Sequence, residues 1–211
     1  MKITDRVVLN GKALNPTTHV KSRPQRILHD KLSTSVSEGR VADWIEKHSR
    51  GYDCLVDLGA GLFNMTEHSR AKRTIGVEVF EEYISNTTHG ENIEKVCGDI
   101  LDVEDFELPE YDIAMMIDVI EHIEKPAAIE LLGKLKRMDH VEKIIIFTPD
   151  GNYEQDFDDW GYGNDKYQTH RSAWSASDFE NLGFTVATNP SFHWEGMGAL
   201  FADWVRTPPA L

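Results

Sequence analysis

The sequence predicts an α/β fold in which a mostly parallel, doubly wound β-sheet is covered by helices on both faces. Two observations lead to this prediction. Short runs of almost continuously apolar residues recur along the chain, and segments with helical periodicity separate several of these runs. Strands of this kind that alternate with helices are typical of parallel sheets that are buried on both sides.

The first helix of this domain is predicted to begin near Thr34. Val41, Trp44 and Ile45 follow the i, i+3, i+4 spacing of one helix face, and Gly51 ends the pattern. The preceding residues, 1–33, have weak periodicity and contain Asn-Pro, Arg-Pro and Gly-Lys pairs. We therefore interpret 1–33 as an N-terminal arm that packs on the domain or orders with a ligand, and 34–211 as the domain itself.

The strands and the remaining helices follow in order. The predicted strands are CLVDL (54–58), TIGVEV (74–79), EKVCGDI (94–100), DIAMMID (112–118), KIIIFT (143–148), FTVAT (184–188) and ALFADWV (199–205). Helices are predicted at 126–138 and 175–183, and a loop rich in Asp, Gly, Asn and Tyr covers 150–168. In such a sheet, ligands bind beyond the carboxyl ends of the strands, so the residues that end each strand are the candidates for function.

Composition limits the classes of function. The chain has 211 residues, which fits one domain, and its net charge of −14 opposes binding along a polyanion. Only the first 30 residues offer a basic patch, so nucleic acid is not favoured as a partner. The longest apolar runs, about five residues, are too short to cross a membrane, and no signal peptide is evident. We expect a cytoplasmic protein whose cysteines, Cys54 and Cys97, are reduced thiols in the core.

Four strand ends carry residues suited to a nucleoside ligand. Gly59 and Gly61 follow the first strand and let the backbone turn tightly and approach a ligand. Glu78 ends the second strand, where a carboxylate can accept both hydroxyl hydrogens of a ribose. Asp99 follows the third strand and suits an adenine amino group, and Asp118 ends the fourth. Taken singly, each has a plainer interpretation as a turn or helix-start residue; their order along the chain gives them weight.

These motifs, in this order, resemble those of the class I S-adenosylmethionine (SAM)-dependent methyltransferases, and the similarity covers residues 34–206. The resemblance implies a Rossmann-like sheet of seven strands with the last strand antiparallel, and a SAM cofactor. By the resemblance, the cofactor-binding residues are Asp57, Gly59, Ala60, Gly61, Glu78, Val79, Asp99, Ile100 and Asp118. The sequence departs from the family at Phe63, where many members have a third glycine. A dinucleotide site is disfavoured because its fingerprint requires glycine where Asn64 stands.

The stretch after the fourth strand, "DVIEH" (118–122), resembles the branch that contains small-molecule O-methyltransferases. Asp118, Glu121 and His122 would share one face of a helical turn. The later segment "HRSAWSASDF" (170–179) resembles that of small-RNA terminal 2′-O-methyltransferases, which hold a divalent metal. By that match, the metal ligands would be Asp118, Glu121, His122 and His170, with magnesium or manganese as the ion. That family has Glu where this chain has Asp118.

Three interpretations of these residues stay open at the level of sequence. The first is the metal site. In the second, His122, His170 and Glu121 act in catalysis without a metal, with a histidine as general base. In the third, they make structural hydrogen bonds, for example with Glu121 capping the helix at 126.

The loop at 150–168 is the predicted lid and substrate selector. Its aromatic residues either line an acceptor pocket or only pack the loop: Tyr153, Phe157, Trp160, Tyr162 and Tyr167. Gly161 and Gly163 are expected to let the lid move. The sequence thus predicts a SAM-dependent methyltransferase that acts on a small molecule, most simply at oxygen. The alternatives are a 2′-O-methyltransferase of an RNA terminus and a non-catalytic SAM-binding partner protein.

Overall fold

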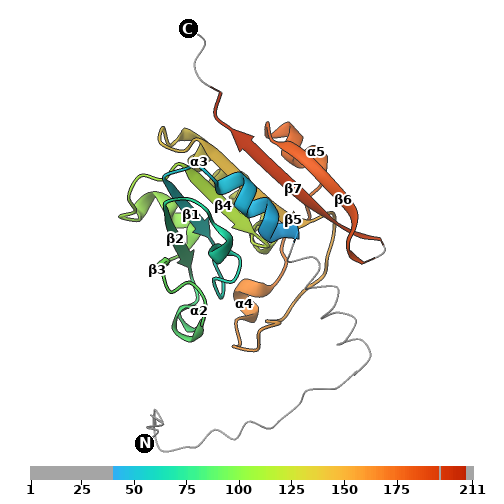
Figure 1. Ribbon diagram of the computed structural model, residues 1–211. Helices are drawn as coiled ribbons and strands as arrows, with labels where there is room; N and C mark the ends of the chain where they lie inside the picture. The colour runs from blue at the N-terminus through green and yellow to red at the C-terminus, as the bar shows by residue number, and fades with distance from the viewer. Residues whose placement is uncertain (1–39, 195, 208–211) are drawn as a thin grey trace, which may run out of the picture.

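A computed structural model describes residues 40–194 and 196–207 of the protein, and its core is a seven-stranded sheet in the order β3-β2-β1-β4-β5-β7-β6 (Figure 1). The strands are β1 (Cys54–Leu58), β2 (Arg73–Glu78), β3 (Glu94–Cys97), β4 (Ile113–Ile117), β5 (Lys143–Pro149), β6 (Thr185–Trp194) and β7 (Met197–Val205). The first five strands pair in parallel, whereas β7 is antiparallel to both of its neighbours, β5 and β6. This arrangement confirms the predicted Rossmann-like sheet of seven strands with an antiparallel last strand.

Helices and short turns connect these strands. The α-helices are α2 (Glu81–Asn86), α3 (Lys125–Arg137), α4 (Asp165–Gln168) and α5 (Ala176–Asn181), and the 3₁₀ turns are η1 (Thr66–His68), η2 (Ile100–Asp105) and η3 (Ile120–His122). A first helix is described over 40–49, and Gly51, with a φ of +93°, follows its end as predicted. Pro126 lies in the first turn of α3, where its missing N–H costs nothing. Ser175 and Asp178 form a capping box that begins α5.

Buried apolar side chains cover both faces of the sheet. In β4, Ile113, Met115 and Ile117 belong to the buried cluster that includes the first helix. The alternate residues Ala114 and Met116 belong to the cluster that includes α3 and α5. Successive side chains of a strand point to opposite faces, so a run that is apolar throughout is what a doubly covered strand requires.

The third strand is shorter than predicted. It ends at Cys97 rather than at residue 100, because the Asp99 carboxylate accepts a hydrogen bond from the Leu101 N–H and starts η2 there. The prediction that both cysteines lie in the core is correct for Cys54, which is buried, and wrong for Cys97, which is exposed on the edge strand β3. Neither cysteine forms a disulfide.

The last two strands are longer than predicted and form a hairpin. Their pairing is regular from Thr185 to Asn189 and then shifts before Trp194. Pro190 lies in the shifted part, where it has no N–H to donate to the ladder. The proposed N-terminal arm and its basic patch, both within residues 1–33, lie outside the described residues.

Candidate functional site

A cavity of about 840 Å³ lies beyond the carboxyl ends of β1, β2 and β4. All the residues that the sequence analysis assigned to cofactor, catalysis or metal line this cavity: Asp57, Gly59, Ala60, Gly61, Glu78, Val79, Asp99, Ile100, Asp118, Glu121, His122 and His170. The structure thus brings strand ends that are distant in the sequence to one place, as the parallel sheet requires. Their roles remain predictions.

The glycine turn after β1 has no room for side chains. Gly59 and Gly61 have φ values of +86° and +54°, a region that residues with a Cβ rarely adopt. A Cβ on Gly59 would lie 2.7 Å from the Val119 side chain, and one on Gly61 would lie 2.6 Å from the Trp160 ring. The absence of Cβ atoms therefore lets Val119 and Trp160 pack directly against the backbone of this turn.

Phe63, the departure from the family pattern, has the backbone of a glycine position, with a φ of +64°. Left-handed backbone costs about 1–2 kcal/mol for a residue with a Cβ. The Phe63 ring is fully buried, which contributes roughly 1.5–3 kcal/mol and offsets this cost. The ring occupies the space above Gly76, where an added Cβ would lie 2.4 Å from the Phe63 Cε1 atom.

Glu78 is held in a fixed orientation beside the glycine turn. Its Oε2 atom accepts a hydrogen bond from the Gly61 N–H, and its Oε1 atom accepts one from the Phe80 N–H, both at 2.8 Å. Burial raises the pKa of Glu78, and these backbone bonds oppose the rise. A carboxylate fixed in this way at the cavity wall keeps lone pairs for the two hydroxyls of a ribose.

Asp57 and Asp99, two more of the predicted cofactor residues, also line the cavity. Asp57 is buried, and its Oδ2 atom accepts a hydrogen bond of 2.6 Å from the Thr66 hydroxyl, whereas its Oδ1 atom has no partner. Burial raises the pKa of Asp57 to about 7. Asp99 lines the cavity and also caps η2, so the plainer interpretation of Asp99 as a cap holds alongside the cofactor interpretation.

Asp118 directly follows β4 and lines the same cavity. It has a φ of +51°, a conformation that Asp tolerates better than most residues, and its N–H donates to the Phe147 carbonyl at 2.9 Å. The Asp118 side chain is open to the cavity, and desolvation by the protein that surrounds it raises its pKa to about 7. The left-handed residue turns the chain from β4 into η3, which carries Glu121 and His122.

Glu121 is 3% exposed and is held by one hydrogen bond, 2.9 Å from the Thr148 hydroxyl to its Oε2 atom. Its Oε1 atom has no partner. Burial, and then the neighbouring Asp118, raise the Glu121 pKa well above its usual range. Glu121 does not cap α3, whose first residue is preceded by Glu124, so that structural interpretation is wrong.

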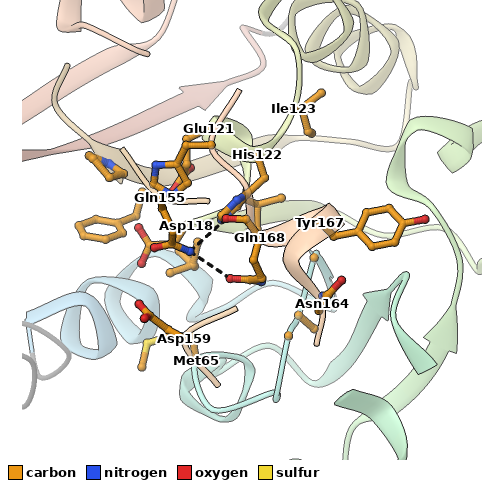
Figure 2. Close-up of a pocket in the computed structure, with 18 of the residues that line it drawn as sticks. Met65, Asp118, Glu121, His122, Ile123, Gln155, Asp159, Asn164, Tyr167 and Gln168 are labelled. Atoms are coloured by element: carbon orange, nitrogen blue, oxygen red, sulfur yellow. Dashed lines mark hydrogen bonds between the residues drawn. The ribbon is translucent and has the colours of Figure 1, made fainter. Parts of the chain in front are cut away.

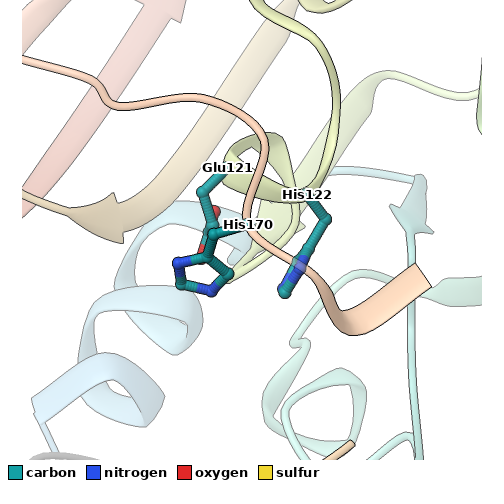
Figure 3. Close-up of side chains that lie close together, drawn as sticks. All are labelled: Glu121, His122 and His170. Carbon is teal, nitrogen blue, oxygen red and sulfur yellow. The ribbon is translucent and has the colours of Figure 1, made fainter. Parts of the chain in front are cut away.

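His122 and His170 lie next to Glu121 (Figure 3). Their ring centroids are 4.6 Å apart, and donor atoms of Glu121, His122 and His170 all lie within 4.8 Å of one another. The segment that carries His170 is fixed to η3, because the N–H groups of Arg171 and Ser172 donate to the Glu121 carbonyl. Asp118 lies in the same cavity but outside this group of three.

The electrostatics of these histidines differ from those of a general base. Burial, and then the proximity of His170, lower the His122 pKa to about 4, and burial also lowers the His170 pKa. Both rings are therefore neutral at pH 7. A base with a pKa near 4 is weak at neutral pH, whereas a neutral imidazole is a good metal ligand.

The predicted lid, 150–168, contributes several residues to the lining of the cavity. Tyr153, Phe157, Trp160 and Tyr167 line the cavity, whereas Tyr162 packs against Tyr83 outside it. The two lid glycines, Gly161 and Gly163, have positive φ values, so the shape of the turn requires them; whether they allow motion stays a prediction.

Three amide side chains of the lid also line the cavity, and sequence reasoning did not find them (Figure 2). The Gln155 amide nitrogen donates to the carbonyl and, more weakly, to the side chain of Gln168. Asn164 is 2% exposed. The spacing of the aromatic residues in this loop was the only signal, and it does not show which side chains between them turn inward.

No model of a known protein family and no curated protein matches the sequence. Comparison with solved structures finds methyltransferases instead. A small-RNA methyltransferase, HEN1, is 18% identical with a TM-score of 0.57; the match covers 83% of this chain, which spans only 26% of that protein. The N-methyltransferase NodS from Bradyrhizobium japonicum WM9 is 12% identical with a TM-score of 0.58, over 85% of this chain and 99% of that one.

Human N-acetylserotonin methyltransferase, solved in complex with SAM, is 14% identical with a TM-score of 0.50, over 82% of this chain and 55% of that one. At these identities the likeness shows the fold. In the described ranges, no helix combines the length and the hydrophobicity needed to cross a bilayer. A seven-stranded sheet with an antiparallel β7, together with these neighbours, establishes that the chain has the class I methyltransferase fold.

Proposed function

We propose that the protein is a SAM-dependent methyltransferase that transfers a methyl group to an oxygen atom of a small-molecule acceptor. The carboxylate of Glu78 is the observation that carries the proposal, because two backbone N–H groups hold it beside the glycine turn, with its remaining lone pairs available to the cavity. In this function, Glu78 binds the ribose, Asp99 and Ile100 contact the adenine, and Asp57 and Asp118 lie near the methionine portion.

In methyl transfer from SAM, the main task of the protein is to position the acceptor. SAM carries an activated methyl group, so the enzyme orients the acceptor in line with the sulfonium and removes a proton from the acceptor. Asp118 has an open position in the cavity and a raised pKa, which suit it to accept that proton, whereas burial lowers the pKa of His122 to about 4.

The residues opposite the cofactor side fit a divalent metal. The unpaired Oε1 of Glu121 and the unpaired Nδ1 of His122 are buried polar atoms that lack protein partners. Glu121, His122 and His170 would hold the ion. Two imidazoles with one carboxylate suit manganese or another borderline metal better than magnesium, which prefers oxygen ligands only. When bound, such an ion would polarise hydroxyl groups of the acceptor.

A second candidate function is 2′-O-methylation of an RNA terminus. The grouping of Glu121, His122 and His170, together with the likeness to a small-RNA methyltransferase, favours it. The lining of the cavity counts against it. Glu154 and Asp159 line the lid side, and none of the lining residues in the described ranges is Lys or Arg. Phosphate groups would meet negative charge there, so we place the small molecule first.

Methyl transfer from isotope-labelled SAM tests both candidates. The purified protein is incubated with a metabolite extract in one reaction and with RNA duplexes that carry a free terminal 2′-hydroxyl in the other, and labelled products are identified by mass spectrometry. RNA already methylated at that hydroxyl is the matched control.

Label that appears in a small molecule and not in RNA supports the proposal. Label in RNA favours the second candidate. If the protein binds neither SAM nor S-adenosylhomocysteine in calorimetry, the proposed function is wrong. If it binds the cofactor but labels nothing in either reaction, the non-catalytic partner protein becomes the better interpretation.

A further inference from the structure

The tip of the lid, residues 158–164, lies on the cofactor side of the cavity rather than on the acceptor side. The ring of Trp160 is so close to the glycine turn that a Cβ on Gly61 would lie 2.6 Å from it. Gly61 is also the residue whose N–H donates to Glu78. The indole therefore lies over the glycine turn whose backbone holds Glu78, next to the place proposed for the cofactor.

One buried carboxylate holds the lid tip in this position. Asp158 accepts hydrogen bonds from the N–H groups of Trp160, Tyr162 and Asn164, at 2.9, 2.7 and 3.1 Å. It also accepts one of 2.7 Å from the Tyr83 hydroxyl, and the Tyr83 ring packs edge-on against Trp160. Tyr83 belongs to α2, which begins three residues after Glu78. The lid tip is thus fastened to the element that follows the proposed ribose ligand.

Asn164 shows that this arrangement is incomplete without a ligand. It is 2% exposed and lines the cavity, and neither its amide nitrogen nor its amide oxygen makes a hydrogen bond (Figure 2). The amide lies near enough to the Tyr83 hydroxyl to oppose the rise in the pKa of that group, but the contact does not satisfy it. Buried amides without partners are rare and costly, so each such group calls for an explanation.

We propose that the lid tip is part of the cofactor site: Asn164 hydrogen-bonds to bound SAM, and Trp160 packs against it. The inference rests on the proposed function, because it takes SAM as the ligand of the cavity. A molecule with ribose hydroxyls and an amino-acid group offers both donors and acceptors, and the Asn164 amide can pair with either kind. The lid then contributes to cofactor affinity as well as to acceptor selection.

Calorimetric titration with S-adenosylhomocysteine tests the role of Asn164. Asn164→Leu keeps the approximate volume and removes the amide, and we expect affinity to fall about tenfold. The melting temperature of the free protein should stay equal or rise, because a buried unpaired amide is lost. Asn181→Leu is the matched control, since Asn181 is an exposed asparagine of α5 that lies outside the cavity, and it should keep the wild-type affinity.

Tryptophan fluorescence tests the role of Trp160. Binding of S-adenosylhomocysteine should change the emission of the wild-type protein, and Trp160→Phe should abolish most of that change although other tryptophans remain. Wild-type affinity in Asn164→Leu, or an unchanged fluorescence response in Trp160→Phe, would overturn the inference and leave the proposed function intact. If the wild-type protein does not bind S-adenosylhomocysteine at all, both are wrong.

Discussion

The two sides of the cavity are built differently. On the cofactor side, the polar groups come from strand ends and from the residues next to them, and the backbone satisfies much of their hydrogen bonding, as at Glu78. On the acceptor side, Glu121 and His122 come from η3 and His170 from beyond the lid, and buried atoms of Glu121 and His122 have no partner.

This difference suggests that the two sides have different tasks, with cofactor binding on one side and methyl transfer to the acceptor on the other. On the cofactor side, the backbone holds Glu78 in place before a ligand arrives, so this carboxylate is suited to bind one substrate in a fixed position, whereas Asp57 Oδ1 and the Asn164 amide still lack partners. The acceptor side keeps unpaired carboxylate and imidazole atoms buried, which is costly unless a metal or an acceptor pairs with them. Substitutions on the two sides should therefore affect different measurements.

The largest effect is expected at His122. His122→Ala removes a proposed metal ligand, and methyl transfer should fall by more than about 100-fold, since even substitutions beyond the ligands cost 10–100-fold. Affinity for S-adenosylhomocysteine should not change. Steady-state rates and calorimetry on the same preparations measure both quantities, and His89→Ala, a histidine paired with Glu67 outside the cavity, is the control.

A chelator extends this test. If the three residues hold a metal, chelation should abolish activity in the wild-type protein and manganese should restore it. Activity that survives chelation would remove the metal from the proposal. A loss of cofactor affinity in His122→Ala would contradict the division into two sides.

The next effect is expected at Glu78. Glu78→Gln replaces a carboxylate that accepts from two N–H groups by an amide with one acceptor oxygen, so one backbone N–H and one ribose hydroxyl lose their partner. Affinity for S-adenosylhomocysteine should fall by roughly 1–3 kcal/mol, or about 5- to 150-fold. Calorimetry measures this change. Unchanged affinity would show that the cofactor does not bind at Glu78.

Asp57 sharpens the comparison, because it is the carboxylate of the cofactor side that has an unpaired oxygen. Its pKa is raised by burial from 3.8 to about 7, so the folded protein keeps a proton that the unfolded chain has already released. The protonated Asp57 therefore contributes to the free energy of unfolding. This contribution is complete below pH 3.8 and is lost as the pH rises to about 7. Asparagine does not titrate, so the stability of Asp57→Asn does not decrease in this way as the pH rises.

The melting temperature of Asp57→Asn relative to the wild type should therefore increase between pH 4 and pH 8. Thermal denaturation of the two proteins across that range, without cofactor, measures the difference. A constant difference would mean that Asp57 is not protonated in the folded state at mildly acidic pH.

The smallest effect is expected at Phe157, which lines the cavity, is 54% exposed and is proposed to face the acceptor. Phe157→Ala should change the melting temperature little and leave cofactor affinity unchanged, because surface substitutions usually stay within about 0.5 kcal/mol. The KM for the acceptor should rise if this ring contacts it. A change in cofactor affinity would instead assign Phe157 to the other side.

The sequence predicted which residues at strand ends line the cavity better than which residues of the lid do, for a physical reason. A parallel sheet brings strand ends together whatever the loops do, so Gly59, Glu78 and Asp99 could be placed from strand order alone. Asn164 could not, because its inward orientation depends on four hydrogen bonds to Asp158, one of them from Tyr83 in a distant element.

Two other differences between prediction and structure, at His122 and at Cys97, also arise because tertiary contacts are not visible in the local sequence. One of the open interpretations made a histidine such as His122 a general base, but the His122 pKa depends on how deeply η3 is buried and on the neighbouring His170. Cys97 was placed in the core because its strand is apolar, but β3 is the edge of the sheet, and strand order across a sheet is not visible in local pattern.

The contact of Phe63 with Gly76 restricts the order in which the two positions can change during evolution. While Phe63 fills the space above residue 76, even alanine there would meet its ring at 2.4 Å. A lineage with glycine at 63 would have that space free, and a larger residue at 76 would then block a later return to phenylalanine. The residue at each position therefore decides which substitutions are neutral at the other. Positions 63 and 76 should diverge as a pair, with a large residue at one and a small residue at the other.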